Sequence, residues 1–265
     1  MKKITRMKRS SAIVVALLAG CVLASCHVNA DDGPATTPSQ RHSHTASGIR
    51  PLPYTANDPV LISTAVGKYD DITAALYDRV FDTTNAGRPT PRQAVTQPSH
   101  RSVQEAIESL RASRNTLVLV CAGDLLTYLD ASAADKIRTT MQDNVRHGKA
   151  PGNTIGKVWE KIGHSLPSDI SLTEASNAQC SSETETRNAS STTPVEDVTL
   201  PQNIVPIYLK PTMSTQDRRS LTWISGNLGS TRDLEKLYKK TTSAPASRVA
   251  KDYLQSEGLA FATDH

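Results

Sequence analysis

The sequence predicts an α/β protein in which a parallel sheet is flanked by helices. Two observations lead to this class. Short aliphatic and β-branched runs, which suit buried strands, alternate along the chain with amphipathic segments that suit helices. A glycine follows two of these runs just before a helical pattern begins. Sequential strand–helix–strand–helix order favours parallel strands whose connecting helices cover the faces of the sheet.

The first strand–helix unit starts at Pro59. The run "PVLISTAV" (59–66) is typical of a buried strand, and Gly67 ends it. The segment "DDITAALYDRVF" (70–81) places apolar residues at helical spacing, so we expect a helix there. A proline-containing spacer follows, within which we expect a short strand at 93–97.

The second unit begins with a helix start signal. Ser102 followed three residues later by Glu105 matches a capping box, and the next apolar residues fall on one helical face. The run "NTLVLVC" (115–121) then predicts another buried strand, after which Gly123 turns into the helical segment 124–130.

The rest of the chain contains more helices and one further strand. Residues 135–164 carry two helical stripes that Gly148 separates. Residues 176–197 are polar and rich in Ser and Thr, which predicts a long loop. A strand at 203–209 precedes three helical segments between residues 214 and 258.

The N-terminus has the pattern of a secretory leader. Residues 1–9 hold five basic side chains and no acidic one, and the uncharged run that follows is too short for a membrane span of about 20 residues. The stretch "LLAGCVLASC" (17–26) contains two tetrapeptides that resemble lipoprotein attachment sites. A signal peptide cleaved after residues 28–30, without a lipid, is the alternative.

Cysteine parity favours one of the two attachment sites. If Cys26 carries the lipid, Cys21 leaves with the leader, and Cys121 and Cys180 remain as an even pair that can form a disulfide in an oxidising compartment. If Cys21 carries the lipid, Cys26 is left as an odd thiol. We therefore expect lipid attachment at Cys26, with Cys21 as the alternative, and a protein anchored to the extracytoplasmic face of the cell membrane. Two buried free thiols are the alternative to the disulfide.

Removal of the leader changes the charge of the protein. The chain has 30 Lys and Arg residues and 26 Asp and Glu residues, and five of the basic ones lie in residues 1–9, so the mature chain carries 25 − 26 = −1. A chain this close to neutral gives no reason to expect nucleic acid as a partner.

The sequence contains no recognisable catalytic motif. A nucleophile elbow, a zinc-binding H-E-x-x-H pair and a P-loop are all missing from it, and its histidines are scattered. We therefore expect no enzyme activity, no catalytic residue, no metal site and no cofactor.

A turn after the first strand is a candidate binding element. Gly67, Lys68, Tyr69 and Asp70 follow the strand where α/β sheets bind their ligands, and Gly123 has the corresponding position after the second long strand. Free backbone N–H groups at a helix start can hold an anionic group there. A plain connecting turn without a ligand is the alternative.

Several of these segments together resemble one protein family. The quoted blocks are "VLISTAVGKYDDITAALYDRVF" (60–81), "LVLVCAGDLLTYLD" (117–130), "LPQNIVPIYLKPTMSTQDRRSLTWISGNLGSTRDLEKLYKK" (200–240) and "ASRVAKDYLQSEGL" (246–259). In order and spacing they resemble the solute-binding lipoproteins of quaternary-amine-uptake ABC transporters. The resemblance covers about half of the chain.

The resemblance implies a periplasmic-binding-protein-like (type II) fold and a transport function. The protein would bind glycine betaine, choline or a related quaternary amine and deliver it to an ABC transporter permease. An aromatic cage would hold the cation, and Tyr69, Tyr128 and Trp159 are the candidates near the expected cleft. The chain departs from the family where Cys121 replaces the expected turn tyrosine.

The second departure concerns the domains. We expect a signal peptide at 1–25, a flexible tether at 26–57, a first lobe at 58–132, a reduced second lobe with a long polar loop at 133–200, and a C-terminal return to the first lobe at 201–262. The reduced lobe leaves an alternative function open, namely a degenerate relative without a transport ligand that has an interaction role in the cell envelope.

Overall fold

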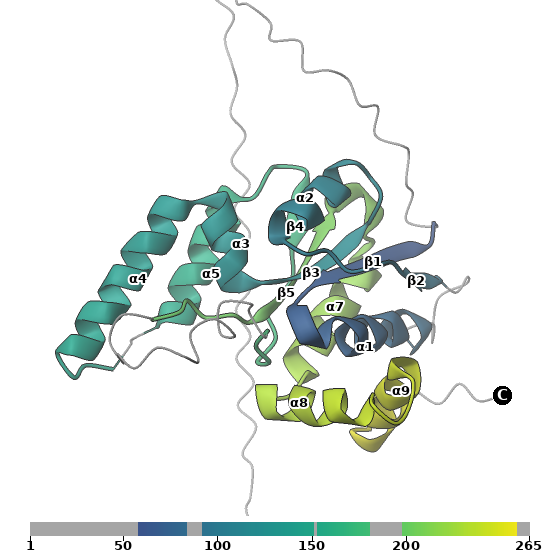
Figure 1. The fold of residues 1–265 in the computed structure, drawn as a ribbon. Coiled ribbons are helices and arrows are strands. Elements are labelled where there is room, and N and C mark those ends of the chain that lie inside the picture. The colour runs from purple at the N-terminus through teal and green to yellow at the C-terminus, as the bar shows by residue number, and fades with distance from the viewer. Residues whose placement is uncertain (1–57, 84–91, 151–152, 181–197, 259–265) are drawn as a thin grey trace, which may run out of the picture. The chain divides into compact units, whose positions relative to one another are not determined.

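The computed structural model describes residues 58–83, 92–150, 153–180 and 198–258 (Figure 1). The predicted leader with Cys21 and Cys26, the tether and most of the polar loop lie outside these ranges. Across the described ranges, no helix combines the length and the apolar character that a membrane crossing requires.

A five-stranded sheet with the strand order β2-β1-β3-β5-β4 forms the centre of the described fold. Its strands are β1 (Val60–Ala65), β2 (Ala94–Thr96), β3 (Leu117–Cys121), β4 (Ile170–Leu172) and β5 (Ile204–Leu209). β1 is parallel to both β2 and β3, as the strand–helix order predicts. β5 is antiparallel to both β3 and β4, so the sheet is mixed and not parallel throughout.

The direction of β5 follows from the path of the chain. After β4, the backbone stays beside β5: Ser176 N donates to Ile204 O at 2.9 Å, and Cys180 N donates to Gln202 O at 2.8 Å. The end of β4 and the start of β5 therefore lie at the same end of the two strands, and β5 must run antiparallel to β4. The first residues of the predicted loop, 176–180, thus belong to this paired segment.

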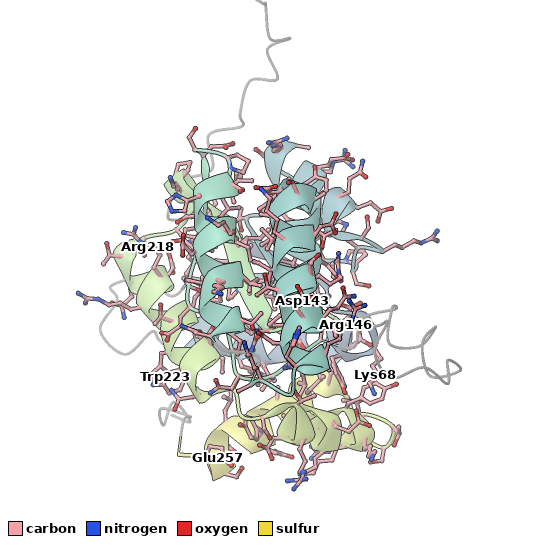
Figure 2. The ribbon with its side chains drawn as sticks, turned by 90° about the vertical axis from the view of Figure 1, so that its left-hand side faces the viewer. Lys68, Asp143, Arg146, Arg218, Trp223 and Glu257 are labelled. Atoms are coloured by element: carbon pink, nitrogen blue, oxygen red, sulfur yellow. A yellow bond between two sulfur atoms is a disulfide. The ribbon has the colours of Figure 1, made fainter. Side chains whose placement is uncertain are left out.

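Helices cover both faces of the sheet (Figure 1). One face is covered by α1 (Asp70–Thr83), α7 (Thr215–Asn227), α8 (Thr231–Lys240) and α9 (Ala246–Ser256). The other is covered by α2 (Val103–Arg111), α3 (Ala122–Leu129), α4 (Ala131–Arg146) and α5 (Thr154–Ser165). Figure 2 shows α4 and α5 side by side in the outer layer of this second group.

β3 shows how the sheet divides the interior into two cores. Its side chains alternate, so that Leu117, Leu119 and Cys121 contribute to the core under α1, while Val118 and Val120 contribute to the core under α2 and α3. All five side chains are buried. A continuous apolar run is therefore the sequence pattern that such a central strand requires.

The helix start signals act largely as the sequence predicts. Ser102 Oγ accepts a hydrogen bond from Glu105 N, whereas the Glu105 carboxylate accepts from Arg101 N and not from Ser102. At α7, Ser214 and Asp217 form a complete capping box. At α2, the backbone N–H that the Glu105 carboxylate binds therefore belongs to Arg101, one residue before the Ser102 that a capping box would use.

Two details differ from the sequence-based expectations. α3 begins directly after β3, so Gly123 lies inside the first helical turn and does not form a connecting turn. A Cβ atom at this position would lie 2.8 Å from both Leu200 Cβ and Gln202 Nε2, so the close approach of that segment requires glycine. Strand β4 was not predicted; it forms through its antiparallel pairing with β5, more than 30 positions further along the chain.

Candidate functional site

A cavity of about 560 Å³ opens where β1, β2 and β3 end. Its walls are residues from the ends of β1 and β3, from the connection between β2 and α2, from the starts of α1 and α2, and from α3: Ala65, Val66, Gly67, Asp70, Ser99, His100, Arg101, Ser102, Val103, Gln104, Cys121, Asp124, Thr127 and Tyr128. Open α/β sheets bind ligands outside the carboxyl ends of their strands. The cavity is therefore the candidate binding site.

Asp70 lies in the cavity wall as the first residue of α1. Its Oδ1 accepts a hydrogen bond from Val66 N at 2.9 Å, and its carboxylate also accepts from the side chains of Thr64 and Ser99. Burial raises the pKa of Asp70, and these hydrogen bonds oppose the rise because they favour the ionised form. The turn around Gly67 thus fixes a carboxylate at the end of β1.

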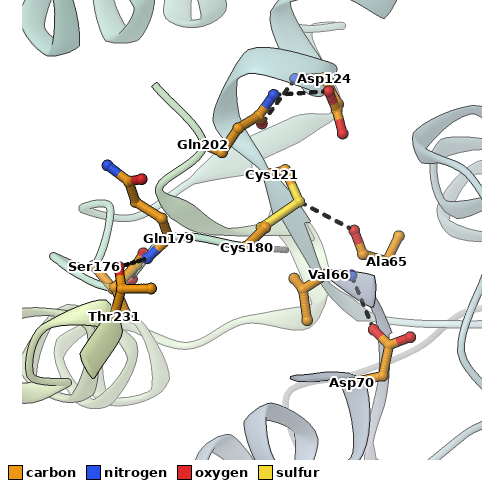
Figure 3. The surroundings of a disulfide bond; sticks show 11 residues. Ala65, Val66, Asp70, Cys121, Asp124, Ser176, Gln179, Cys180, Gln202 and Thr231 are labelled. Atoms are coloured by element: carbon orange, nitrogen blue, oxygen red, sulfur yellow. Dashed lines mark hydrogen bonds between the residues drawn. A yellow bond between two sulfur atoms is a disulfide. The ribbon is translucent and has the colours of Figure 1, made fainter. Parts of the chain in front are cut away.

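Asp124 occupies the corresponding position after β3. Its Oδ1 accepts a hydrogen bond from Gln202 Nε2 at 2.9 Å, as Figure 3 shows. Gln202 lies 78 residues away in the sequence, just before β5. Burial raises the pKa of the Asp124 carboxyl, and the Gln202 hydrogen bond opposes the rise.

Neither carboxylate is paired with a cation in the described part of the chain. The ion pairs among the described residues involve neither Asp70 nor Asp124. Both side chains are half-buried. Burial of a carboxylate without a cationic partner is unfavourable. The cavity wall thus presents two carboxylates outside any ion pair, with Arg101 in the same lining.

His100 also lines the cavity, and hydrogen bonds to Asn115 and Thr64 hold it in place. Its ring Nε2 lies 3.0 Å from the amide nitrogen of buried Asn115, and its backbone N donates to Thr64 O at 2.7 Å. Burial lowers the pKa of His100. From the sequence, His100 is predicted to be an ordinary surface histidine. Its place in the cavity wall depends on its contacts with Asn115 and with Thr64.

The expected disulfide is present beside the cavity. Cys121 at the end of β3 is bonded to Cys180, with their Cα atoms 5.9 Å apart (Figure 3). Both residues are buried. The bond attaches the segment before residue 181 to the strand end that forms part of the cavity wall.

The structure places the six predicted ligand-binding candidates in different surroundings. Gly67 and Tyr128 line the cavity. Tyr128 is 40% exposed and is the only aromatic residue among the described residues that line it. An aromatic cage of several walls is therefore not assembled from this lining.

Lys68 and Tyr69 contact α8 and do not line the cavity. Lys68 Nζ lies 2.9 Å from Glu235 Oε2, and the Tyr69 hydroxyl donates to the same oxygen at 2.5 Å. The buried Tyr69 ring meets the Tyr238 ring edge-on, with centroids 5.7 Å apart. In Figure 2, Lys68 lies beside the yellow helices at the C-terminal end of the described chain.

Gly123 and Trp159 also lie outside the cavity lining. Gly123 faces Leu200 and Gln202. Trp159, on α5, is half-buried and packs against the core under α2 and α3. Asp124, the next residue in the first turn of α3, does line the cavity.

Comparisons with known proteins identify the fold. No protein-family model and no curated protein matches the sequence. A crystal structure of a glycine betaine/carnitine/choline ABC transporter protein is 10% identical, with a TM-score of 0.53 over 77% of this chain and 100% of that chain. Apo YehZ from Escherichia coli is 9% identical, with a TM-score of 0.51 over 76% of this chain and 99% of that chain. The described chain therefore has the mixed α/β fold of periplasmic binding proteins.

Proposed function

We propose that this protein is an extracytoplasmic solute-binding lipoprotein that captures a small cationic solute and presents it to an ABC transporter permease. The observation that carries the proposal is the cavity at the ends of β1 and β3, whose wall holds Asp70 and Asp124 without a cationic partner in the described chain. The fold supports it, because ligands of such sheets bind at this edge.

The first solutes to test follow from the resemblance to quaternary-amine-uptake proteins. They are glycine betaine, choline and carnitine, all of which carry a permanent cationic group. The carboxylates of Asp70 and Asp124 would attract that group, and the exposed ring of Tyr128 would offer one face to it. No catalytic step is proposed for the site.

The proposed anchor is a lipid on Cys26, with Cys21 as the alternative. In this proposal residues 1–25 are the signal peptide, and residues 26–57 are a tether between the membrane and the binding unit. The charge pattern of the leader and the cysteine parity support it. Mass determination of the mature N-terminus, together with membrane fractionation of the Cys26→Ala and Cys21→Ala variants, distinguishes the two sites.

The proposed binding unit combines residues 58–132 with residues 201–262, and residues 133–200 act as a reduced second lobe. In support, β5 pairs with β3 in the sheet that also contains β1 and β2, and α7 packs on α1. β4, from residues 133–200, is the edge strand of the same sheet. Within the described part of residues 133–200, the elements are most of α4, together with α5 and β4, which favours a reduced lobe.

Ligand-induced stabilisation tests the proposed function. The mature protein is unfolded thermally with glycine betaine, choline, carnitine and proline at millimolar concentrations. A ligand at 100 times its dissociation constant should stabilise the protein by about 2.7 kcal/mol. Stabilisation by none of a broad set of cationic solutes would contradict transport binding.

That outcome would favour the second candidate function, a relative that has lost its transport ligand and interacts with other envelope components. The single aromatic residue in the described lining of the cavity is the observation that supports this alternative.

A further inference from the structure

Asp70 and Asp124 approach the same cavity from two different elements. Asp70 begins α1 after β1, and Asp124 lies in the first turn of α3 after β3. Because β1 and β3 are adjacent parallel strands, their ends bring the two residues to one edge of the sheet. A small ligand in the cavity therefore meets carboxylates from both strands.

Each carboxylate keeps acceptor capacity. A carboxylate offers about four lone-pair sites. Asp124 Oδ1 accepts from Gln202, and no hydrogen bond to Asp124 Oδ2 is recorded among the described residues. The donors to Asp70 are neutral, namely Val66 N and the Thr64 and Ser99 hydroxyls. Neutral donors hold these carboxylates in place but do not neutralise them.

The kind of cation that suits this wall follows from its chemistry. A quaternary ammonium has no N–H group, so it depends on several aromatic faces for tight binding. The described lining offers one such face, Tyr128. A primary or secondary ammonium instead donates charge-assisted hydrogen bonds to carboxylates, which are about twice as strong as neutral ones.

We propose that the preferred ligand is a small solute with a primary or secondary ammonium group, whose N–H groups donate to Asp70 and Asp124. This inference rests on the proposed solute-binding function and narrows its ligand class. It predicts that fully methylated amines such as choline and glycine betaine bind more weakly than their N–H-bearing parents. Arg101 lines the same cavity, so solutes with and without a carboxylate both need testing.

Two methylation series test the inference on the mature protein by titration calorimetry at neutral pH. One runs from ethanolamine through its mono- and dimethyl derivatives to choline, and the other from glycine through sarcosine and dimethylglycine to glycine betaine. The expected result is an affinity that falls along at least one series, with a loss of about tenfold or more at the quaternary member.

The outcomes separate this inference from the proposed function. If neither series shows this fall while at least one of their members binds, the inference is wrong and solute binding stands. If no member of either series binds at millimolar concentration, both the inference and the proposed function are contradicted.

Variants of the two carboxylates provide the second test. Asp70→Asn and Asp124→Asn should each weaken binding of the N–H-bearing ligand by about tenfold or more, because a charged acceptor is lost. Asp71→Asn is the matched control, since Asp71 is exposed, lies next to Asp70 and does not line the cavity. Asp124→Asn retains an acceptor for Gln202 and keeps the test decisive if Asp70→Asn fails to fold. Equal affinities for all three variants and the wild type would overturn the inference.

Discussion

Arg92 donates a hydrogen bond from Nη1 to Asp217 Oδ2 over 2.6 Å, across 125 positions of the sequence. The two side chains are 2% and 1% exposed. Arg92 Nε also donates to Asp58 O, and the same Asp217 oxygen accepts from Ser214 N and Oγ. One buried carboxylate therefore caps α7 and holds the chain segment before β2.

Removal of Arg92 should leave the charge of Asp217 buried and without a cationic partner. We expect Arg92→Leu to lower the free energy of unfolding by about 3–5 kcal/mol, measured by urea denaturation. The control is Arg138→Leu, which removes an exposed partner of Asp135 and should cost less than about 1 kcal/mol. Equal losses for the two variants would show that the Arg92 pair is not a determinant of stability.

The disulfide between Cys121 and Cys180 should be a major source of stability. It closes a loop with a sequence separation of 59, for which the loss of chain entropy in the unfolded state corresponds to about 4 kcal/mol. We expect the Cys121→Ala/Cys180→Ala variant and the reduced wild type to unfold at similarly lower urea concentrations. Reductant should not shift the variant further, and an unshifted reduced wild type would contradict the prediction.

Tyr77 and Ser225 should show the contribution of one buried hydroxyl pair. Their oxygens lie 2.9 Å apart between α1 and α7, and burial holds the pKa of Tyr77 well above its ordinary value. Tyr77→Phe leaves the Ser225 hydroxyl without this partner and should cost about 1–2 kcal/mol in thermal or urea unfolding. Tyr253→Phe, which removes an exposed hydroxyl 3.5 Å from Asn227 O, should change stability by less than about 0.5 kcal/mol. A larger loss from the second variant would be inconsistent with this account.

Asp124 should contribute less to the stability of the ligand-free protein at neutral pH than in mild acid. Burial raises the pKa of the folded-state carboxyl, so over the window from its unfolded pKa of about 3.9 up to the raised value the folded state binds more protons. The contribution of protonated Asp124 to the free energy of unfolding is therefore present at low pH and is lost as the pH rises through that window.

The Asp124→Asn variant tests this sign directly. Without ligand it should have a higher melting temperature than the wild type at pH 7, and the difference should disappear below the unfolded-state pKa. Melting curves across this pH range measure the effect, with Asp71→Asn as the control. A variant that is less stable than the wild type at pH 7 would contradict the prediction.

The helices and central strands follow from local patterns in the sequence. The stripe in residues 70–81 becomes α1, and the run 115–121 contains β3, because helical spacing and continuous apolar character are properties of neighbouring residues. The capping box at Ser214 is local for the same reason. β4 was not predicted, and its pairing partner β5 lies more than 30 positions away in the sequence.

The candidate site is only partly predictable. Gly67 follows from its position after a strand, Tyr128 was a candidate through the family resemblance, and both line the cavity. Lys68 has a similar position in the sequence but contacts Glu235, because the packing of α8 decides which way this turn faces. His100 and Asp124 carry no sequence signal for the cavity, since their places depend on contacts with Asn115 and Gln202.

The sequence by itself determined the α/β class, the alternation of strands and helices, and the even cysteine pair, because periodicity and parity can be read along the chain. The tertiary structure alone decided that β5 runs antiparallel, that Arg92 meets Asp217, and that the Asp70 and Asp124 carboxylates share one cavity. The physical reason is that hydrogen bonds and charge pairs between distant segments depend on the path of the chain. That path is set by the packing of two cores against one sheet.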